Sequence, residues 1–552
     1  MSIQTAAVEY QTVVVGSACL VKELLERLQV AAIIDRALRF QPEVATTYGA
    51  LAQVLIVNRM SMDPQPLYQL ASWAAERGID RLFDLQAEWL DDDRLGALLD
   101  ALADHQVTIW SALLGQAAQQ FALDMEQLHA DTTSVYFEGA YEDDNGRPKG
   151  GGERVPRLVR GYNKDGKRQK LQLVLSLITS HHIPLWFRPW DGNQSDDGVY
   201  VPDMTELRAT LLVPENAILM GDRKLATEAN MRTFCRQRQL FLAAHPWTPT
   251  AQALWRETAA RLAAGEREWR PVDYTPRREA NQPAEQHAAY RVVEVVRPLA
   301  DPEHGQEYPL RYQFVWSSRK ELRDQTQRER ALAAGEAALQ RIARLLGKYA
   351  YKRRAWIELQ IEKALRSAKA SDYFTATLLG REAEQHWELR WERRAEAIAA
   401  AAVFDGISLL VSNLPEERLA PEGLLPKYKE QIDAEQTIDF IKSPVAIRPM
   451  WLQNPQRLAG LTLLIMIAVL VAGLLEQSVR RWIARTGCLV NGLMPEGRDN
   501  AYPTAKKLLR AFADYALVVR RDATGAEEVH YPKLRPVQQQ IWEIMKLPPL
   551  PA

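Results

Sequence analysis

Two apolar stretches, Leu128-His-Ala-Asp131-Thr-Thr-Ser134 and Ala217-Ile-Leu-Met-Gly-Asp222, decide how the middle of this chain folds. Both are short, and the second is mainly apolar before its aspartate, which is typical of buried β-strands. Asp131 lies inside the first stretch, and Asp222 ends the second. Two carboxylates on apolar strands are therefore the first candidates for a functional site.

The residues around these stretches predict the order of the neighbouring elements. Residues 171–178 alternate in the manner of a strand, with Leu at every second position. The elements predicted next are a turn at 180–182, a strand at 183–187, a helix at 200–212, the Asp222 strand, a helix at 226–236 and a strand at 240–244. Three strands, helix, strand, helix, strand is the start of a ribonuclease-H-like sheet, so we expect an α/β fold. Such a core needs one more helix, and Glu435 lies on the best candidate.

The segment around Glu435 has helical spacing. Gln431, Glu435 and Lys442 follow Tyr428 at offsets of 3, 7 and 14, which places all four along one helix face. Glu435 and Lys442 are then about 10 Å apart along the axis, at ~1.5 Å per residue. That distance suits one group that binds a metal and another that holds a phosphate nearby. On composition alone, the segment is an amphipathic helix of a kind that often arises by chance.

The chemistry of the three acidic residues points to divalent cations. Asp131, Asp222 and Glu435 supply the hard oxygen ligands that hold a pair of such ions beside a phosphodiester. Each aspartate also has a plainer interpretation, because either could hydrogen-bond locally and Gly221-Asp222 is a common turn pair. Carboxylates at the ends of neighbouring strands would, however, repel one another unless cations neutralise them. Their occurrence together favours a metal site.

Composition limits the alternatives. The chain of 552 residues needs two to four domains, and 47% hydrophobic with 25% charged residues is typical of a soluble globular protein. Three cysteines without metal-ligand spacing predict neither a disulfide framework nor a zinc site. The net charge of −1 argues against general affinity for DNA, so local patches would have to supply it. One such patch is the basic run 154–170, which a solvated loop would also explain; its members include Arg160, Lys164, Lys167 and Arg168.

The pattern predicts five segments. They are an all-helical N-terminal domain at 1–120 that we expect to bind DNA ends, a first part of the core at 121–245, a mixed β/helical insertion domain at 246–425, a second part of the core with the Glu435 helix at 426–490, and a C-terminal tail at 491–552. The insertion's helices at 320–400 could serve as an arm for DNA or for a second protomer. A solvated helical hairpin is the plainer alternative.

Residues 458–475 contain no charged side chain and satisfy the length rule for a membrane-spanning helix. No aromatic anchor stands at the C-terminal side of this segment, so we expect a core helix that covers the sheet and no membrane. The first residues lack the basic and apolar regions of a signal peptide, which predicts a cytoplasmic, nucleoid-associated protein.

Five motifs together resemble a known family. They are Asp131-Thr-Thr133, Gly161-Tyr-Asn-Lys-Asp165, Gly192-Asn193, Gly221-Asp-Arg223 and Tyr428-x2-Gln431-x3-Glu435-x6-Lys442. In this order they resemble the cut-and-paste DDE transposases of bacterial insertion sequences, specifically those with a YREK signature, and the likeness extends over nearly the whole chain.

The resemblance implies that Asp131, Asp222 and Glu435 bind two Mg²⁺ ions, for which Mn²⁺ is an expected substitute. Tyr428, Lys442 and Arg223 would contact DNA. Gln431 departs from the signature, which has Arg there, and Gln cannot clasp a phosphate with a fixed charge.

The expected function is therefore excision and insertion of an insertion sequence by metal-dependent hydrolysis and strand transfer. Double-stranded DNA, as element ends and as target, is the expected partner, and joining two ends requires at least a homodimer in the synaptic complex. Two alternatives stay open: a ribonuclease-H-like nuclease without strand transfer, and a decayed DNA-binding remnant, which Gln431 would favour. Terminal repeats, target preference, the excision route and the resting oligomeric state are not encoded in any recognisable pattern.

Overall fold

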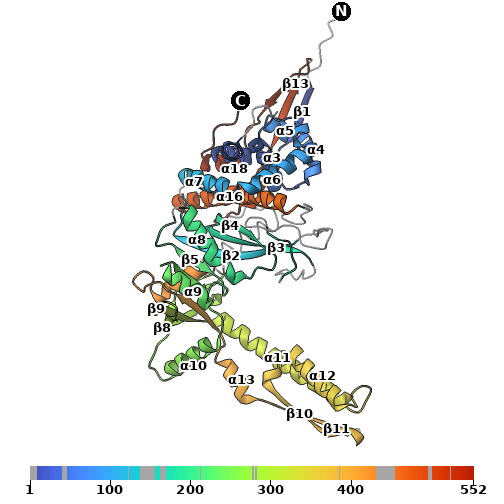
Figure 1. Ribbon diagram of the computed structural model, residues 1–552, viewed down its shortest axis with the longest axis vertical. Helices are drawn as coiled ribbons and strands as arrows, with labels where there is room; N and C mark the ends of the chain where they lie inside the picture. Colours follow the sequence, from blue (N-terminus) through green and yellow to red (C-terminus); the bar gives the residue numbers. More distant parts are fainter. Residues whose placement is uncertain are drawn as a thin grey trace, which may run out of the picture. The chain divides into compact units, whose positions relative to one another are not determined.

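The computed structural model describes residues 9–39, 46–121, 123–136, 156–161, 170–211, 213–276, 279, 282–384, 386–430, 454–494, 500–522 and 524–551. The chain forms two compact units (Figure 1). Residues 1–240 and 430–552 make the first unit, and residues 241–429 make the second.

The first unit joins the two ends of the chain in a small sheet. β1 (Glu9–Val14) pairs antiparallel with β13 (Ala516–Arg521), which also pairs with β14 (Glu527–His530). Val13 faces Leu517 in this register, and both side chains are buried. The prediction of an all-helical segment up to residue 120 is therefore wrong at β1. Its partner strand lies some five hundred residues further along the chain, so no local pattern indicates the pairing.

Helices fill the segment between β1 and the main sheet. They are α1 (Ala18–Arg27), α2 (Val30–Leu38), α3 (Tyr48–Met60), α4 (Leu70–Glu76), α5 (Ile79–Leu82), α6 (Asp92–Asp104) and α7 (Gln106–Phe121). The carboxylate of Asp91 caps α6, because it accepts a hydrogen bond from the Arg94 backbone N–H at 2.8 Å. Leu95, Leu98, Leu99 and Leu102 of α6 are all buried. Their helical spacing in the sequence is thus the core-facing side of this helix.

The main sheet of the first unit has the predicted order of elements. These are β2 (Gln127–Tyr136), β3 (Gln172–Ser180), β4 (Ile183–Trp190), α8 (Tyr200–Thr210), β5 (Ile218–Gly221) and α9 (Glu228–Arg236). The predicted strand that follows, β6 (Leu240–Ala244), belongs almost wholly to the second unit. The strand order is β4-β3-β2-β5, with β5 parallel to β2 and the others antiparallel. The predicted turn between β3 and β4 is formed by His181 and His182, whose φ angles of 47° and 69° are both left-handed. Two such residues suit a two-residue hairpin turn.

α16 (Pro455–Thr486) is the central helix of the first unit. It contacts α3 and α6 as well as β4, and Figure 1 shows it between the helices and the sheet. It is the one described helix long and apolar enough to cross a membrane, and its most apolar window is completely buried within the protein. The prediction of a core helix over residues 458–475 is therefore confirmed. α17 (Ala505–Arg510) and α18 (Pro536–Ile544) follow it.

Two glycines let α16 approach its neighbours closely. A Cβ added at Gly460 would lie 2.0 Å from the Leu99 carbonyl oxygen of α6. A Cβ at Gly473 would lie 2.6 Å from the His182 carbonyl oxygen, in the β3–β4 turn. Both obstacles are backbone atoms, so neither contact could be relieved by a side-chain rotation.

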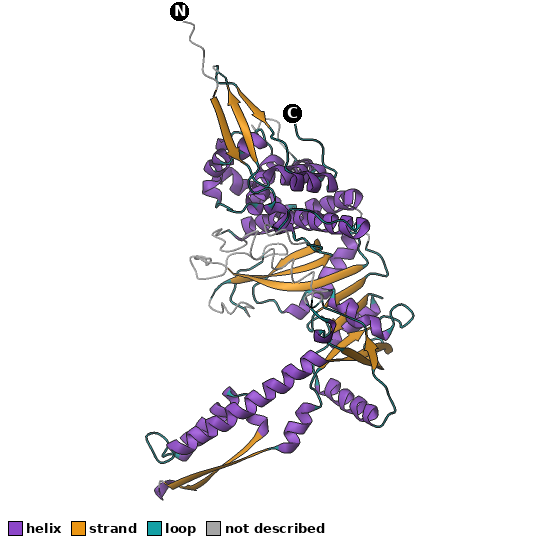
Figure 2. Ribbon diagram, turned by 180° about the vertical axis from the view of Figure 1, so that it is seen from behind, coloured by secondary structure: helices purple, strands orange, loops and turns teal. Residues whose placement is uncertain are grey.

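The second unit contains a sheet and a long helical arm. The sheet order is β6-β12-β9-β8-β7. Its further elements are α10 (Pro249–Ala263), β7 (Arg270–Val272), β8 (Tyr290–Asp301), β9 (Gln306–Ser317), α13 (Ala395–Ala402), β12 (Ile407–Ser412) and α14 (Pro421–Lys429). The arm consists of α11 (Ser318–Leu345), α12 (Arg354–Ser367), β10 (Phe374–Arg381) and β11 (His386–Arg393). In Figure 2 the two helices run side by side, with the two-stranded hairpin along them.

The glycines of α16 provide a test of this packing. Gly460→Ala and Gly473→Ala should each lower the free energy of unfolding by about 1–3 kcal/mol, because the added methyl group overpacks the contact. Gly115→Ala in α7 is the matched control, since a Cβ there meets nothing within 4 Å. It should raise stability by about 0.5–1 kcal/mol. Denaturant unfolding measures all three, and a Gly460→Ala protein as stable as the wild type would contradict the close approach of α16 and α6.

Candidate functional site

The parallel pairing of β2 with β5 brings the two predicted aspartates together. Ala130 is in register with Gly221, so Asp131 and Asp222 occupy the next pair of positions, where β5 has just ended. Adjacent strands lie about 4.8 Å apart. Both side chains are half-buried. The juxtaposition expected from the sequence is therefore present, at the C-terminal end of β5.

Two donors hold one oxygen of Asp222. The hydroxyl of Tyr200 donates to Oδ1 at 3.0 Å, and the backbone N–H of Lys224 donates to the same oxygen at 2.8 Å. Among the described residues, no hydrogen bond falls on Oδ2. The carboxylate is thus fixed on one side, and its second oxygen is available to a ligand.

Negative charge accumulates around Tyr200, which is buried at the start of α8. Burial raises the pKa of Tyr200 well above its usual value, as do the charges of Asp222 and Asp131, the hydrogen bond to Asp222 and the charge of Asp196. Three carboxylates from different elements therefore act on one phenol. Such a cluster loses stability through repulsion unless a cation neutralises it.

Asp196 was not expected at this site from the sequence. It lies at the start of the short turn before α8, and one of its oxygens accepts a hydrogen bond from the Thr132 hydroxyl at 2.9 Å. Thr132 in turn gives its backbone N–H to Asp131 Oδ1 at 2.7 Å. The acidic residues of the segment 191–198, directly after β4, were a usable signal in the sequence. Tyr200 carried no signal of its own.

A fourth acid, Asp203, lies one turn further along α8 and is buried. Its Oδ1 accepts a hydrogen bond from the Trp186 indole at 3.3 Å. Burial raises the pKa of Asp203 to about 7, against the lowering effect of hydrogen bonds from Ser176 and Trp186. We regard Asp203 as structural, because it packs against β3 and β4 rather than beside Asp222.

The other predicted site residues are distributed as follows. Arg223 directly follows Asp222 and is exposed, and Arg160 is exposed beside the bridge that joins Val159 to Gln172 at the start of β3. Lys164, Lys167, Arg168, Gln431, Glu435 and Lys442 lie outside the described residues.

Of the predicted helix from Tyr428 to Lys442, the structure describes only the beginning. Tyr428 is half-buried in the last turn of α14, but this helix ends at Lys429, and Glu430 lies in a turn. Pro426 stands inside α14, where it removes a helical hydrogen bond. The rest of the predicted helix, from Gln431 to Lys442, lies outside the described residues.

Two tryptophans, Trp247 and Trp316, pack against the core of the second unit. Trp247 stacks on Phe314 with ring centroids 6.2 Å apart and meets Phe404 edge-on at 5.1 Å. The guanidinium of Arg291 covers Trp316 at 4.0 Å. These contacts give both tryptophans a role in the packing of the second unit.

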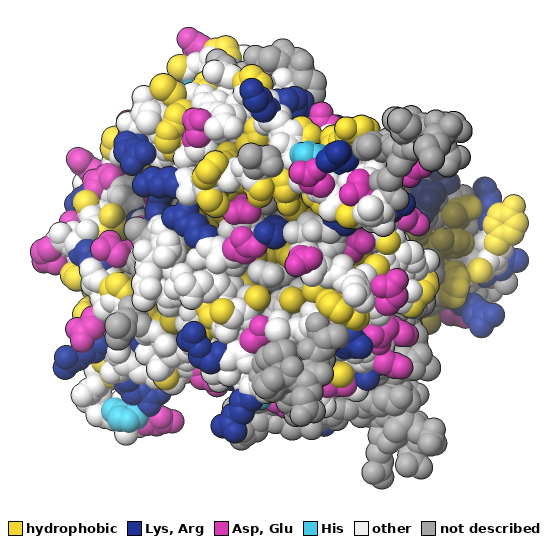
Figure 3. All heavy atoms as spheres, turned by 90° about the horizontal axis from the view of Figure 1, so that it is seen from above, with side chains coloured by type: hydrophobic (Ala, Val, Ile, Leu, Met, Phe, Trp, Pro, Cys, Tyr) yellow, Lys and Arg dark blue, Asp and Glu magenta, His cyan; other side chains and the backbone are white. Residues whose placement is uncertain are grey.

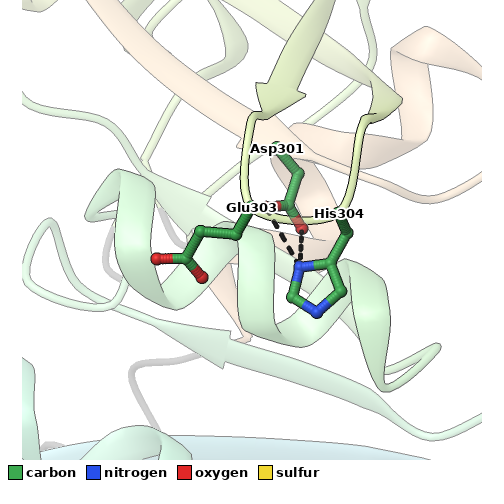
Figure 4. Close-up of side chains that lie close together, drawn as sticks. All are labelled: Asp301, Glu303 and His304. Carbon is green, nitrogen blue, oxygen red and sulfur yellow. Dashed lines mark hydrogen bonds and ion pairs between the residues drawn. The ribbon is translucent and has the colours of Figure 1, made fainter.

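A second acidic cluster lies on the β8–β9 turn (Figure 4). Ligand-type atoms of Asp301, Glu303 and His304 fall within 4.8 Å of one another. His304 Nδ1 lies 3.4 Å from the Asp301 carboxylate, and its backbone N–H donates to the Asp301 carbonyl oxygen. Glu303 and His304 are exposed. These contacts are those of a closed turn, and we assign no metal to it.

Comparisons with known proteins found one matching family model and two distantly similar solved structures. Residues 10–113 match the model of a domain of unknown function, DUF4277. No curated protein matches the chain. A synaptic complex of the piggyBac transposase with hairpin DNA is 10% identical, with a TM-score of 0.35 over 90% of this chain and 79% of that one. A pre-cleavage Mos1 transpososome is 11% identical, with a TM-score of 0.15 over 44% of this chain and 84% of that one. Similarities this low do not identify what the chain binds or does.

Asp203 predicts a pH dependence of stability. An aspartate in the unfolded chain ionises near pH 3.9, whereas folded Asp203 keeps its proton to about pH 7. Between these values the folded protein holds a proton that the unfolded chain has released, so stability falls as the pH rises from about 4 to 7. Asp203→Asn stays neutral and can still accept from Trp186. It should be more stable than the wild type by up to about 4 kcal/mol at pH 8 and equal to it at pH 4. Equal stability of the two proteins across this range would contradict the assignment.

The carboxylate cluster predicts stabilisation by divalent cations. Mg²⁺ or Mn²⁺ at a hundred times its Kd should stabilise the wild type by about 2.7 kcal/mol. Asp222→Asn keeps an oxygen for Tyr200 and Lys224 but lowers the charge, so this variant should be at least as stable in EDTA and gain little from metal. Thermal unfolding with and without the ion measures both effects. Asp197→Asn, the same change in the neighbouring loop, is the control. An equal stabilisation of all three proteins by the metal would contradict the assignment of a metal site to Asp222.

Proposed function

We propose that this protein is a DNA transposase that cuts and rejoins phosphodiesters at the ends of an insertion sequence. The observation that carries the proposal is the in-register placement of Asp131 and Asp222 at the end of β5. Glu435 is the third member of the proposed triad. The resemblance of the sequence motifs to transposases with a YREK signature supports the same reading.

The residues present fit a pair of hard divalent ions. The donors are carboxylate oxygens, which Mg²⁺ prefers, and Mn²⁺ would serve as a substitute. Asp131, Asp222 and Glu435 would hold the ions, and the charge collected around Tyr200 is the charge that they would neutralise. When bound, such ions supply Lewis-acid activation and neutralise charge on the phosphodiester.

The chain's own groups orient these ligands. Tyr200 and the Lys224 N–H hold Asp222 Oδ1, so Oδ2 keeps one direction. The Thr132 N–H does the same for Asp131 Oδ1, and the Thr132 hydroxyl links this strand to Asp196. Ligands fixed before the ion arrives lose little freedom on binding, which raises the affinity of the site.

Exposed cations beside the aspartates would meet the DNA backbone. Arg223 and Lys224 follow Asp222 and are exposed. Arg160, Lys164, Lys167 and Arg168 are proposed to add phosphate contacts from the basic run, and Tyr428, Gln431 and Lys442 to contact DNA near the cut. Joining two ends would require at least a homodimer, and we place the protein in the cytoplasm with the nucleoid.

Gln431 favours a second candidate, a remnant that binds DNA without cutting it. A glutamine lacks the fixed charge with which arginine clasps a phosphate. The remnant and the active enzyme differ in one measurable property, which is metal-dependent cleavage.

Cleavage of DNA carrying the flanks of the protein's own gene tests the proposal. The wild type should cut at the element boundary in Mg²⁺ and not in EDTA. Asp131→Asn, Asp222→Asn and Glu435→Gln should each still bind the DNA but cleave it far more slowly. The loss of cleavage activity should exceed the roughly 10–100-fold that is typical when a residue that only supports a metal ligand is changed. Asp197→Asn should cut like the wild type.

The products separate the candidates. Joined donor–target DNA identifies a transposase, and cut ends without joining identify a nuclease. Binding without cutting in any metal would identify a remnant, with Gln431→Arg as the first change to restore activity. Cleavage that survives in Asp222→Asn would contradict the site.

A further inference from the structure

The arm of the second unit has its own core and an unusual tip. Ile342 near the end of α11 packs with Ile357 and Ile361 of α12, and with Trp387 of β11. The connection between the helices turns tightly, because the Tyr351 N–H donates to the Lys348 carbonyl oxygen at 2.8 Å and the Gly347 N–H donates to Tyr351 at 2.9 Å. The tip, defined as residues 341–356, is therefore an ordered turn between the two helices.

The tip carries charge of one sign. Residues 337–357 contain six cations and no Asp or Glu: Arg341, Arg344, Lys348, Lys352, Arg353 and Arg354. Arg354 is engaged by Glu358 and by the carbonyl oxygens of Leu378 and Gly380. The other five are exposed, and within the described part of the chain none of their side chains forms an ion pair or a hydrogen bond.

The rest of the arm is arranged differently. Along the same two helices, Lys320 pairs with Asp324 and Arg366 with Glu362, and Arg393 of β11 pairs with Glu336. The face of the molecule seen in Figure 3 likewise mixes basic and acidic side chains. A local concentration of five unpaired cations therefore stands out in a chain whose net charge is −1.

Helix stability does not account for this arrangement. Cations favour the C-terminal end of a helix, so Arg341 and Arg344 could serve α11. Lys352 and Arg353, however, immediately precede the N-terminus of α12, where a positive charge is unfavourable. Their presence costs the fold some stability, which indicates an anionic partner.

Tyr349 adds an aromatic surface to the charge. Its side chain is 84% exposed at the centre of the tip, and its φ angle is 50°. A left-handed conformation is unfavourable for a residue other than glycine and tends to persist where function requires it. Trp356, in the first turn of α12, is also partly exposed. Exposed aromatic rings among cations are suited to a nucleic acid, which offers phosphates to the charges and the apolar surface of sugars and base edges to the rings.

We propose that the tip of the arm binds duplex DNA, with Arg341, Arg344, Lys348, Lys352 and Arg353 on phosphates and Tyr349 against the sugar or base edges. This proposal rests on the proposed function, because it takes DNA as the substrate. The DNA-binding element that it adds, the tip, lies far along the chain from Asp131 and Asp222. Duplex DNA presents one negative charge per roughly 1.7 Å of its axis, which matches a dense patch of cations.

The test measures binding of a duplex of about 30 base pairs to full-length protein over a range of salt concentrations. Lys352→Glu/Arg353→Glu should raise the Kd about tenfold or more and lower the slope of log K against log salt by about 2. The substitutions place acids at the N-terminus of α12, so folding should not suffer. Arg330→Glu/Lys363→Glu, the same charge change at exposed positions elsewhere on both helices, should leave the Kd within about twofold.

Tyr349→Gly separates a binding role from a structural one. Glycine accepts the left-handed angle, so the thermal stability should be equal or higher. DNA affinity should nevertheless fall about fivefold or more if the ring contacts DNA. An unchanged DNA affinity would show that the Tyr349 ring does not contact DNA.

The outcomes distinguish this proposal from the proposed function. If the wild type cuts DNA and the tip variant binds and cuts like the Arg330/Lys363 control, the tip proposal is wrong and the function stands. If the wild type never cuts but binds duplex DNA through the tip, the function is wrong and the tip proposal stands. Tighter binding of single-stranded RNA than of duplex DNA at the tip would overturn the choice of DNA, and a wild type that binds no duplex would overturn the tip proposal.

Discussion

A helix without a polar side must be covered on every side, and α16 imposes this constraint on the first unit. Its apolar window is completely buried, with α3 and α6 among the helices on one side and β4 on the other. Gly460 and Gly473 permit backbone contact in both directions. Removing such a helix from its neighbours would expose a large apolar surface to water, so the helices, the sheet and the segments after α16 depend on one another. The strands that carry Asp131 and Asp222 are held in place by this packing.

The carboxylates of Asp131, Asp222 and Asp196 lower the stability of the first unit, because their charges repel one another. The register of β2 and β5 places two acids side by side, and Asp196 brings a third near Tyr200. The fold tolerates them because each accepts hydrogen bonds: Asp222 from Tyr200 and Lys224, and Asp131 and Asp196 from the backbone N–H and the hydroxyl of Thr132. A site of this kind keeps repulsion in the folded state and releases it when cations bind, so the same residues that weaken the protein give the site its affinity.

The sequence predicted what depends on local pattern. Apolar runs and turns identified the strands from β2 to β6 in order, and this order placed Asp131 and Asp222 at the ends of neighbouring strands. Contacts made across space were not predictable in this way. Tyr200 and Asp196 reach the site from a turn and a helix start, Thr132 acts through its hydroxyl, and β1 has its partner at the other end of the chain. The tip of the arm was visible only as composition, because exposure and the absence of ion pairs at its five cations are properties of the folded chain.

The small sheet of β1, β13 and β14 has a consequence for synthesis. Val13 leaves the ribosome early, whereas its neighbour Leu517 follows about 25–100 s later at 5–20 residues per second. Until then, β1 cannot form its hydrogen bonds to β13, and the helices of the first unit cannot pack against the segment that contains β13. A chain released by premature termination would carry the aspartates yet leave an unpaired strand edge, which invites aggregation or degradation. The pairing of β1 with β13 thus makes the packing of the first unit depend on a segment that is synthesised some five hundred residues later.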